Sequence, residues 1–181
     1  AGIFSPEDGR KLGLEGMILE IVKECDFSTI KETPAFDVIS ADNPVALANL
    51  ITAAEEAHTR ELDTDKLLQA VRAQTKNTPV LGITGTGGAG KSSLTDELIR
   101  RFLSELPDQK IAILSIDPTK QKTGGALLGD RIRMNAIFNK RVFMRSLATR
   151  GSRTEISSAL GDVLDVVKAA DFVMSIFLQH G

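Results

Sequence analysis

The sequence predicts an α/β protein whose parallel β-sheet is flanked by helices. From residue 79 onward, apolar runs of strand length alternate with amphipathic runs of helix length. A glycine-rich stretch, residues 85–92, separates the first such strand from the first such helix. The hydrophobic fraction of 42% over 181 residues is enough for a sizeable core. Before residue 79 the pattern is mainly helical, so we expect other elements to precede the sheet.

Composition narrows the function classes. The formal net charge of −2 gives no reason to expect nucleic acid or a membrane surface as a partner. No apolar run reaches the roughly 20 residues that span a bilayer, and no signal peptide is visible. Cys25 is the only cysteine, which suits a reducing compartment and predicts a cytoplasmic protein. Because Cys25 lies in a helical run, we expect its thiol to be buried and unreactive.

Residues 1–27 are predicted to form the end of an α/β unit. The apolar run 1–4 is expected as a strand, and residues 5–9, which include proline and glycine, as a turn. Apolar residues then recur at helical spacing from Arg10 to Cys25. One strand and one helix cannot bury a core alone, so this part must pack on another part of the protein.

Residues 28–77 are predicted to be a helical linker. Residues 28–42 show no sustained period. Asn43 can cap a helix that runs to about His58, whose imidazole we expect at the helix end rather than on a metal. Thr64 can cap a second helix. The apolar face of that second helix consists of Leu67, Leu68 and Val71.

Residues 78–181 are predicted to form the sheet domain, with parallel strands because strands and helices alternate. The expected strands are 79–84, 110–116, 141–146 and 172–178. The expected helices are 92–106, 131–138 and 154–170. The inward-facing residues are expected to be Leu94, Leu98, Ile99, Phe102, Leu103 and Leu106 in the first helix, and Ile156, Ala159, Leu160, Val163, Val167 and Ala170 in the last.

The stretch Gly85–Ser92 reads GTGGAGKS and fits the phosphate-binding pattern G-x-x-x-x-G-K-[ST] at every fixed position. Glycines let successive backbone N–H groups point at an anion, and the following helix adds its positive end. Lys91 is expected to reach the β- and γ-phosphates as the catalytic cation, and the Ser92 hydroxyl to hold Mg²⁺. The alternative is a glycine-rich turn that binds nothing. The strand before the loop and the helix after it favour a P-loop NTPase.

Two carboxylates and a group of cations could assist this loop. Asp117 ends the second expected strand, where ligands bind in open α/β sheets, and Mg²⁺ prefers such hard oxygen ligands. Asp130 follows a polar loop and could either face the metal or cap the helix after it. The cations could stabilise the γ-phosphate or simply be solvated. They are Lys120, Lys122, Arg131 and Arg133.

Three segments resemble a known family: LGITGTGGAGKSSLTDEL (81–98), SIDPTKQKTGGALLGDRIRMN (115–135) and RVFMRSLATRG (141–151). They resemble the GTPase domain of the fused isobutyryl-CoA mutases, adenosylcobalamin-dependent enzymes that carry their own chaperone GTPase. They are also similar to the stand-alone GTPase chaperones of methylmalonyl-CoA mutase. Residues 3–27 resemble the last strand and helix of the flavodoxin-like, cobalamin-binding domain of the same family.

The resemblance implies a GTPase that couples nucleotide state to cofactor loading of an acyl-CoA mutase. GTP or GDP and Mg²⁺ would be its ligands, with residues 118–133 as a nucleotide-sensing switch. The parent, which interconverts isobutyryl-CoA and butyryl-CoA, would be a homodimer that binds adenosylcobalamin and holds the mutase and cobalamin-binding domains as partners in the same chain. The implied nucleotide-binding residues are Gly85, Gly87, Gly88, Ala89, Gly90, Lys91, Ser92, Ser93 and Arg133. The implied metal-binding residues are Ser92, Ile116 through its carbonyl, Asp117 and Asp130.

The sequence also departs from the family's pattern. In the family the strand corresponding to residues 172–180 ends in a Glu-Thr-Ser-Gly segment that completes the Mg²⁺ site, whereas no carboxylate stands here. The guanine-reading Asn-Lys-x-Asp type segment, the mutase barrel and the cobalamin-ligating histidine are not found, so we expect a middle portion that does not rearrange carbon skeletons itself. Two other functions stay open: a small-molecule kinase or ATPase on the same loop, and a non-catalytic interaction fragment.

Overall fold

The computed structural model divides the chain into two compact units. The first is Ala1–Glu32 and the second is Thr33–Gly181. The residues that the structure describes are 4–25, 27, 39–57, 64–117, 133–148 and 153–180.

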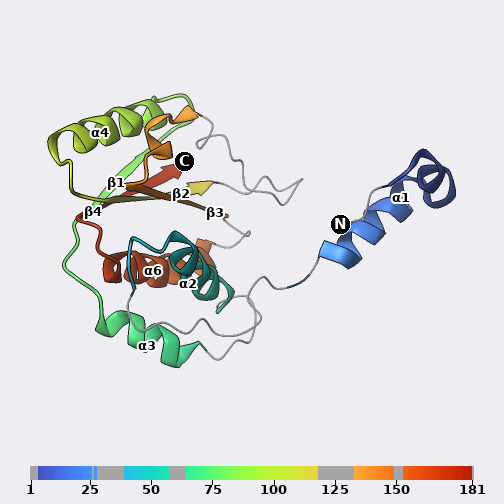
Figure 1. Ribbon diagram of the computed structural model, residues 1–181, viewed down its shortest axis with the longest axis horizontal. Coiled ribbons are helices and arrows are strands. Elements are labelled where there is room, and N and C mark those ends of the chain that lie inside the picture. The colour runs from blue at the N-terminus through green and yellow to red at the C-terminus, as the bar shows by residue number, and fades with distance from the viewer. Residues whose placement is uncertain are drawn as a thin grey trace. The chain divides into compact units, whose positions relative to one another are not determined.

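The first unit contains the helix α1 (Pro6–Cys25), drawn in blue in Figure 1. The helix begins at Pro6 because Ser5 caps it: Ser5 Oγ accepts the Asp8 N–H at 3.2 Å, and the Asp8 carboxylate accepts the Ser5 N–H at 2.9 Å. The turn predicted over residues 5–9 is therefore wrong from Pro6 onward. Gly13, at φ 65°, interrupts the helical conformation and kinks α1.

No side chain of α1 is buried. Cys25 is exposed, so the prediction of a buried thiol is wrong. The large apolar side chains face solvent as well, with Leu14 72% and Leu19 62% exposed. Among the described residues of this unit, α1 has no second layer against which a face could be buried, which explains both findings. Of the strand predicted at residues 1–4, only Phe4 is described, and it is not in a strand.

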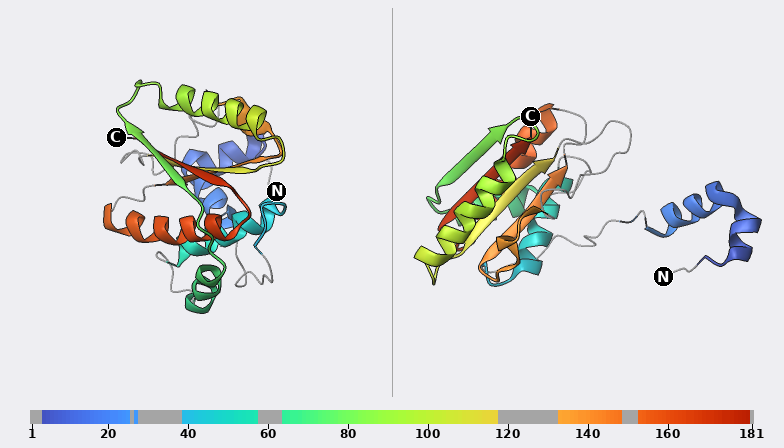
Figure 2. Two further views of the ribbon diagram at one scale, coloured as in Figure 1. Left: turned by 90° about the vertical axis from the view of Figure 1, so that its left-hand side faces the viewer. Right: turned by 90° about the horizontal axis from the view of Figure 1, so that it is seen from above.

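The second unit is built on a four-stranded parallel sheet in the order β1-β4-β2-β3. The strands are β1 (Val80–Gly85), β2 (Ile111–Asp117), β3 (Val142–Ala148) and β4 (Met174–His180). Each begins one or two residues later than predicted, and their parallel arrangement confirms the expected α/β class. The right-hand view of Figure 2 shows β4, in red, between β1 and β2 although it comes last in the chain.

Helices cover both faces of this sheet (Figure 1). One face carries α4 (Lys91–Glu105) and the 3₁₀ helix η1 (Ala136–Phe138), and the other carries α2 (Pro44–Glu56) and α6 (Arg153–Ala169). The remaining helix, α3 (Asp65–Ala73), packs against α6. The core beneath α4 consists of Ile99, Phe102, Ile111, Ile113, Met134, Ile137, Met144, Ile176 and Leu178.

The helices expected in the linker contribute to the core of this second unit. Their buried apolar residues include Leu47, Leu50, Ile51, Leu67, Leu68 and Val71. Asn43 caps α2 as predicted, because its Oδ1 accepts the Ala46 N–H at 3.0 Å. Thr64 stands at the cap position of α3, but its side chain makes no capping hydrogen bond. Both helices therefore lie in the same compact unit as the sheet.

The inward face of α4 differs from the one predicted. Ile99 is fully buried as expected, but Leu94 is 53% and Leu106 is 44% exposed. Thr95 and Asp96 are buried instead. The buried face follows what packs on the helix, and Asp96 contacts η1 through a hydrogen bond that apolar periodicity does not register. In α6 the buried Val163 and Val167 agree with the prediction, as does the buried Ala170 directly after the helix.

The histidine at position 58 and the side chain of Ile156 lie outside the described residues. Within the parts of the chain that the structure describes, no helix combines the length and apolar character that crossing a membrane requires.

Candidate functional site

The carboxyl ends of β1, β4 and β2 meet at one edge of the sheet. Gly85 pairs with His180, and Ile116 pairs with Gln179. Asp117, the last residue of β2, therefore lies two strands away from Gly85, about 10 Å by the usual spacing of neighbouring strands. The glycine-rich loop and Asp117 thus share the edge where open α/β sheets bind ligands.

The loop between β1 and α4 adopts backbone conformations that favour glycine. Gly88 and Gly90 lie in the left-handed region, at φ 81° and 85°. A Cβ atom built on Gly87, Gly88 or Gly90 would meet nothing within 4 Å. Glycine at positions 88 and 90 is therefore required by the backbone and not by close packing, and the space around the loop is open to a ligand.

Lys91 is the first residue of α4 and folds back over the loop that precedes it. Lys91 is only 7% exposed, and its Nζ donates to the carbonyl oxygens of Gly85 at 2.7 Å and Thr86 at 2.8 Å. A buried ammonium group needs such partners because desolvating an unpaired charge is expensive. These two bonds account for two of its three N–H donors. The positive charge is held at the loop itself, where the motif predicts it.

The first turn of α4 adds further donors. Its N-cap is Gly90, whose missing side chain supplies no capping acceptor, and the turn contains no acidic residue. The positive end of the helix dipole is therefore not neutralised by its own side chains. Ser92 and Ser93 lie in this turn, Ser92 half-buried and Ser93 exposed. Such a helix end, with Lys91 beside it, suits an anion that has several oxygen atoms.

The residues predicted to hold Mg²⁺ are described only in part. Ile116 is 4% exposed and Asp117 ends β2, but the side chain of Asp117 is not described. Within the described ranges, no group of three or more His, Cys, Asp and Glu side chains could hold a metal ion. The Mg²⁺ assignment to Ser92, Ile116, Asp117 and Asp130 stays a prediction. The predicted site residues outside the described ranges are Lys120, Lys122, Asp130 and Arg131.

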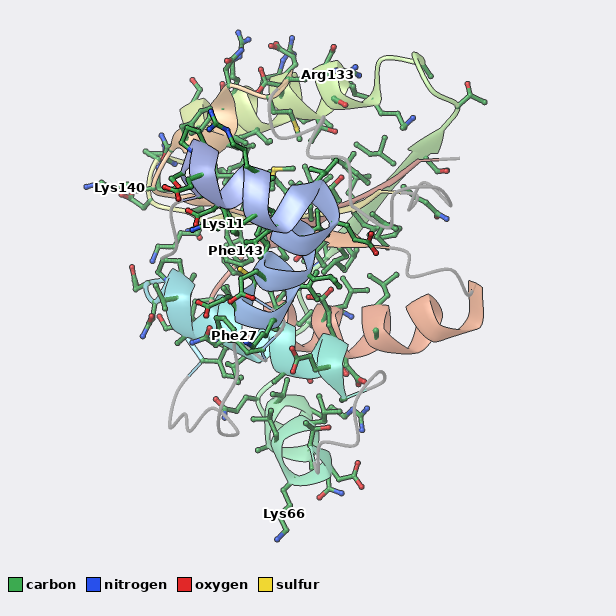
Figure 3. All side chains as sticks on the ribbon, turned by 90° about the vertical axis from the view of Figure 1, so that its right-hand side faces the viewer. Lys11, Phe27, Lys66, Arg133, Lys140 and Phe143 are labelled. Atoms are coloured by element: carbon green, nitrogen blue, oxygen red, sulfur yellow. The ribbon has the colours of Figure 1, made fainter. Side chains whose placement is uncertain are left out.

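Arg133 is exposed, and Figure 3 shows it beside α4. Two residues near the site were missed by sequence reasoning. Asp96 is buried on α4 and bonded to η1, and its polar side chain amid an apolar helical pattern could have revealed it. Gln179 lies on the strand between Gly85 and Asp117, a place that follows from strand order and not from local sequence.

A separate hollow of about 470 Å³ lies away from the loop, among residues that include Lys110, Arg141 and Phe143. Two of its cations are engaged: Lys110 pairs with Asp42, and Arg141 donates to carbonyl oxygens at the end of α4, including that of Leu103 at 2.9 Å. It opens where β2 and β3 begin, at the opposite end of the sheet from Gly85. The hollow is therefore not part of the sheet edge that carries the glycine-rich loop.

Comparison with known proteins identifies relatives of the whole chain. A family model described as "Methylmalonyl Co-A mutase-associated GTPase MeaB" matches residues 47–178. A fused isobutyryl-CoA mutase from Geobacillus kaustophilus is 58% identical over 187 aligned residues, and one from Cupriavidus metallidurans is 53% identical over 185; each alignment covers 100% of this chain. A third, from Nocardia farcinica, is 50% identical over 180 residues and covers 99% of this chain. The chain spans only 16–17% of the length of these relatives.

Proposed function

This chain belongs to the MeaB family of methylmalonyl-CoA mutase-associated GTPases, and from that premise we propose that it is the GTPase segment of a fused acyl-CoA mutase. It binds guanine nucleotide, hydrolyses GTP and couples the nucleotide state to loading of the mutase with its cobalamin cofactor. The supporting relatives are fused isobutyryl-CoA mutases that align with the chain from end to end. The interconversion of isobutyryl-CoA and butyryl-CoA is proposed for the longer parent protein.

One observation carries the nucleotide-binding part of this proposal. Lys91 is held inside a loop in which Gly88 and Gly90 adopt left-handed conformations, at the carboxyl edge of a parallel sheet. The adjacent helix end offers backbone N–H groups with no acidic side chain in its first turn. Phosphate oxygens would satisfy these donors, and the Lys91 ammonium would exchange a loop carbonyl for a phosphate oxygen.

We propose the following roles for the site residues. The loop amides from Gly85 to Ser93 cradle the phosphates, and Arg133 contacts the nucleotide. Bound Mg²⁺ would neutralise charge that develops on the phosphates during hydrolysis. Its proposed ligands have the hard oxygen donors that this ion prefers, from a hydroxyl, a backbone carbonyl and carboxylates. They are Ser92, Ile116, Asp117 and Asp130. Lys91 stabilises the charge that moves toward the leaving phosphate oxygen.

In the parent protein we propose three regions within this span. Residues 1–27 end a flavodoxin-like cobalamin-binding domain, residues 28–77 form the helical connection, and residues 78–181 begin the P-loop GTPase domain. The exposed apolar side chains of α1 support the first assignment, because a helix with no buried face needs a further layer. Adenosylcobalamin and the mutase domain are partners within the parent chain, which we propose to be a homodimer in the cytoplasm.

The proposal is tested by replacing the lysine of the loop. Lys91→Ala removes a charge-assisted contact with phosphate, so we expect GTP affinity in the presence of Mg²⁺ to fall by about 10- to 100-fold. Titration calorimetry on the 181-residue chain measures this loss. Lys140→Ala is the matched control, because Lys140 is an exposed lysine beside the hollow at the other end of the sheet.

Two outcomes would contradict the proposal. Unchanged GTP affinity in Lys91→Ala would instead support a non-catalytic interaction fragment. Tighter binding of ATP than of GTP, measured in the full-length fused protein, would support the kinase or ATPase alternative.

A further inference from the structure

A buried carboxylate on α4 takes no part in the chemistry proposed so far. Asp96 is 6% exposed and lies five residues after Lys91 on the same helix. Its Oδ1 accepts the backbone N–H of Ala136 at 2.8 Å, and its Oδ2 accepts Arg100 Nη2 at 3.3 Å. A buried carboxylate is unfavourable unless its oxygens are hydrogen-bonded. These two hydrogen bonds therefore offset the free-energy cost of burying the Asp96 charge.

The N–H that Asp96 accepts is the first of η1. No capping hydrogen bond comes from the side chain of Asn135, the residue before η1. Asp96 therefore caps this short helix from a distant part of the chain, 40 residues earlier in sequence. Figure 1 shows the corresponding orange segment next to α4.

Apolar packing fixes the same segment against the same helix. Met134 is 0% and Ile137 is 8% exposed, and both share a core cluster with Ile99 and Phe102 of α4. Arg133 directly precedes Met134 and is exposed. The backbone at Arg133 is thus held within three residues of two anchors, the Met134 side chain and the Asp96 hydrogen bond.

We infer that Asp96 is a positioning residue for the nucleotide site. One helix carries both the phosphate-binding lysine at its start and the carboxylate that fixes the segment beginning at Arg133. Asp96 touches no nucleotide; it sets where Arg133 stands relative to the loop. The inference rests on the proposed function, because Arg133 is there the residue that contacts the nucleotide.

The first experiment compares Asp96→Ala with Asp96→Asn in the 181-residue chain. Alanine removes the acceptor, so the Ala136 amide should exchange its hydrogen about tenfold faster. GTP affinity with Mg²⁺ present should fall by about fivefold. Asparagine keeps an acceptor oxygen, so Asp96→Asn should retain most of the slow Ala136 exchange and most of the GTP affinity. Glu97→Ala is the control, since Glu97 is a neighbouring carboxylate on the exposed side of α4 that pairs with Arg101.

The second experiment separates positioning from general stability. If Asp96 acts through Arg133, the loss of GTP affinity caused by Asp96→Ala should vanish in an Arg133→Ala background. Equal losses in both backgrounds, or unchanged affinity in Asp96→Ala, would overturn the inference.

Failure of the proposed function looks different. In that case the wild-type chain and Lys91→Ala bind GTP equally poorly, whatever stands at position 96. Faster hydrogen exchange of the Ala136 amide in Asp96→Ala would then show that Asp96 only caps η1, and its positioning role would be overturned.

Discussion

In the first unit Ile18 is 51% exposed, whereas Ile99 in the second unit is 0% exposed, although each is an isoleucine in a helix. Two helices, α1 in the first unit and α2 in the second, nevertheless begin in the same way. Ser5 caps α1 and Asn43 caps α2, and each helix has proline at its first position. Local hydrogen bonds therefore define where a helix begins in both units. Burial requires a second layer, which the sheet supplies in the second unit, whereas the described residues of the first unit form α1 alone.

Because of this difference, truncating an apolar side chain should change the free energy of unfolding far more in the second unit than in the first. Ile99→Ala should lower the free energy of unfolding by about 2–5 kcal/mol, because it leaves a cavity in the core. Ile18→Ala should change it by less than about 0.5 kcal/mol, since the side chain already meets water. Urea unfolding followed by far-ultraviolet circular dichroism measures both values. A large loss in Ile18→Ala would show that α1 is buried in solution.

Removing one ion pair from each unit should give a smaller difference in the free energy of unfolding. Arg145 of β3 donates to Glu55 and to Thr52 of α2, each at 2.9 Å, and the charged partners are 30% and 18% exposed. Arg145→Met should lower the free energy of unfolding by about 1–2 kcal/mol, because Glu55 is left half-buried without this partner. The exposed pair of Lys11 and Glu7 offers the comparison, and Lys11→Ala should change the same quantity by under about 0.5 kcal/mol. Equal effects of the two substitutions in urea unfolding would refute this ordering.

Removing the helix cap of α1 and that of α2 should have different effects on stability. Asn43→Ala should lower the stability of the second unit by about 1 kcal/mol, since the Ala46 N–H loses its acceptor. Ser5→Ala should fray the start of α1 and leave the urea midpoint of the second unit unchanged. Amide hydrogen exchange near each cap, measured beside urea unfolding, distinguishes local from global loss. A shift of the second unit's midpoint in Ser5→Ala would contradict a purely local role of the Ser5 cap.

The smallest expected effect is the response of α1 to acid. The hydrogen bond from the Ser5 hydroxyl, followed by that from the Ser5 N–H, holds the pKa of Asp8 below its ordinary value of 3.8. A depressed carboxyl pKa stabilises the folded helix above pH 3.8, and this contribution is lost as the pH falls through the lower, folded value. Nuclear magnetic resonance should show the start of α1 fraying as the pH falls below 3.8. In Ser5→Ala the acid transition should move back toward pH 3.8; an identical transition would show that Ser5 does not set it.

Much of the site could be predicted from the sequence because its geometry is local. The loop pattern from Gly85 to Ser92 fixes which residues need left-handed backbone and where the lysine stands. The structure places Lys91 at that loop and Asp117 at the same edge of the sheet. Strand positions were also close, since hydrophobic periodicity records which face of each element is buried. The helix predicted over residues 131–138 was not: residues 134 and 135 are not helical, and Ala136–Phe138 form the 3₁₀ helix η1.

Other features depend on contacts between distant parts of the chain. Periodicity placed Leu94 on the inner face of α4, yet Leu94 is exposed and Asp96 is buried, because Asp96 accepts a hydrogen bond from the Ala136 N–H of η1. The exposed Cys25 was missed because a helical pattern cannot state whether a second layer lies against it.

The sequence alone determined the phosphate loop, the parallel α/β class and the helix cap at Asn43. These follow from backbone dihedral limits and hydrogen bonds between residues a few positions apart. Tertiary structure alone decided that β4 separates β1 from β2, and that the carboxylate of Asp96 reaches Ala136. Strand order and long-range capping depend on which elements pack together to bury the most apolar surface, and that is a property of the whole chain.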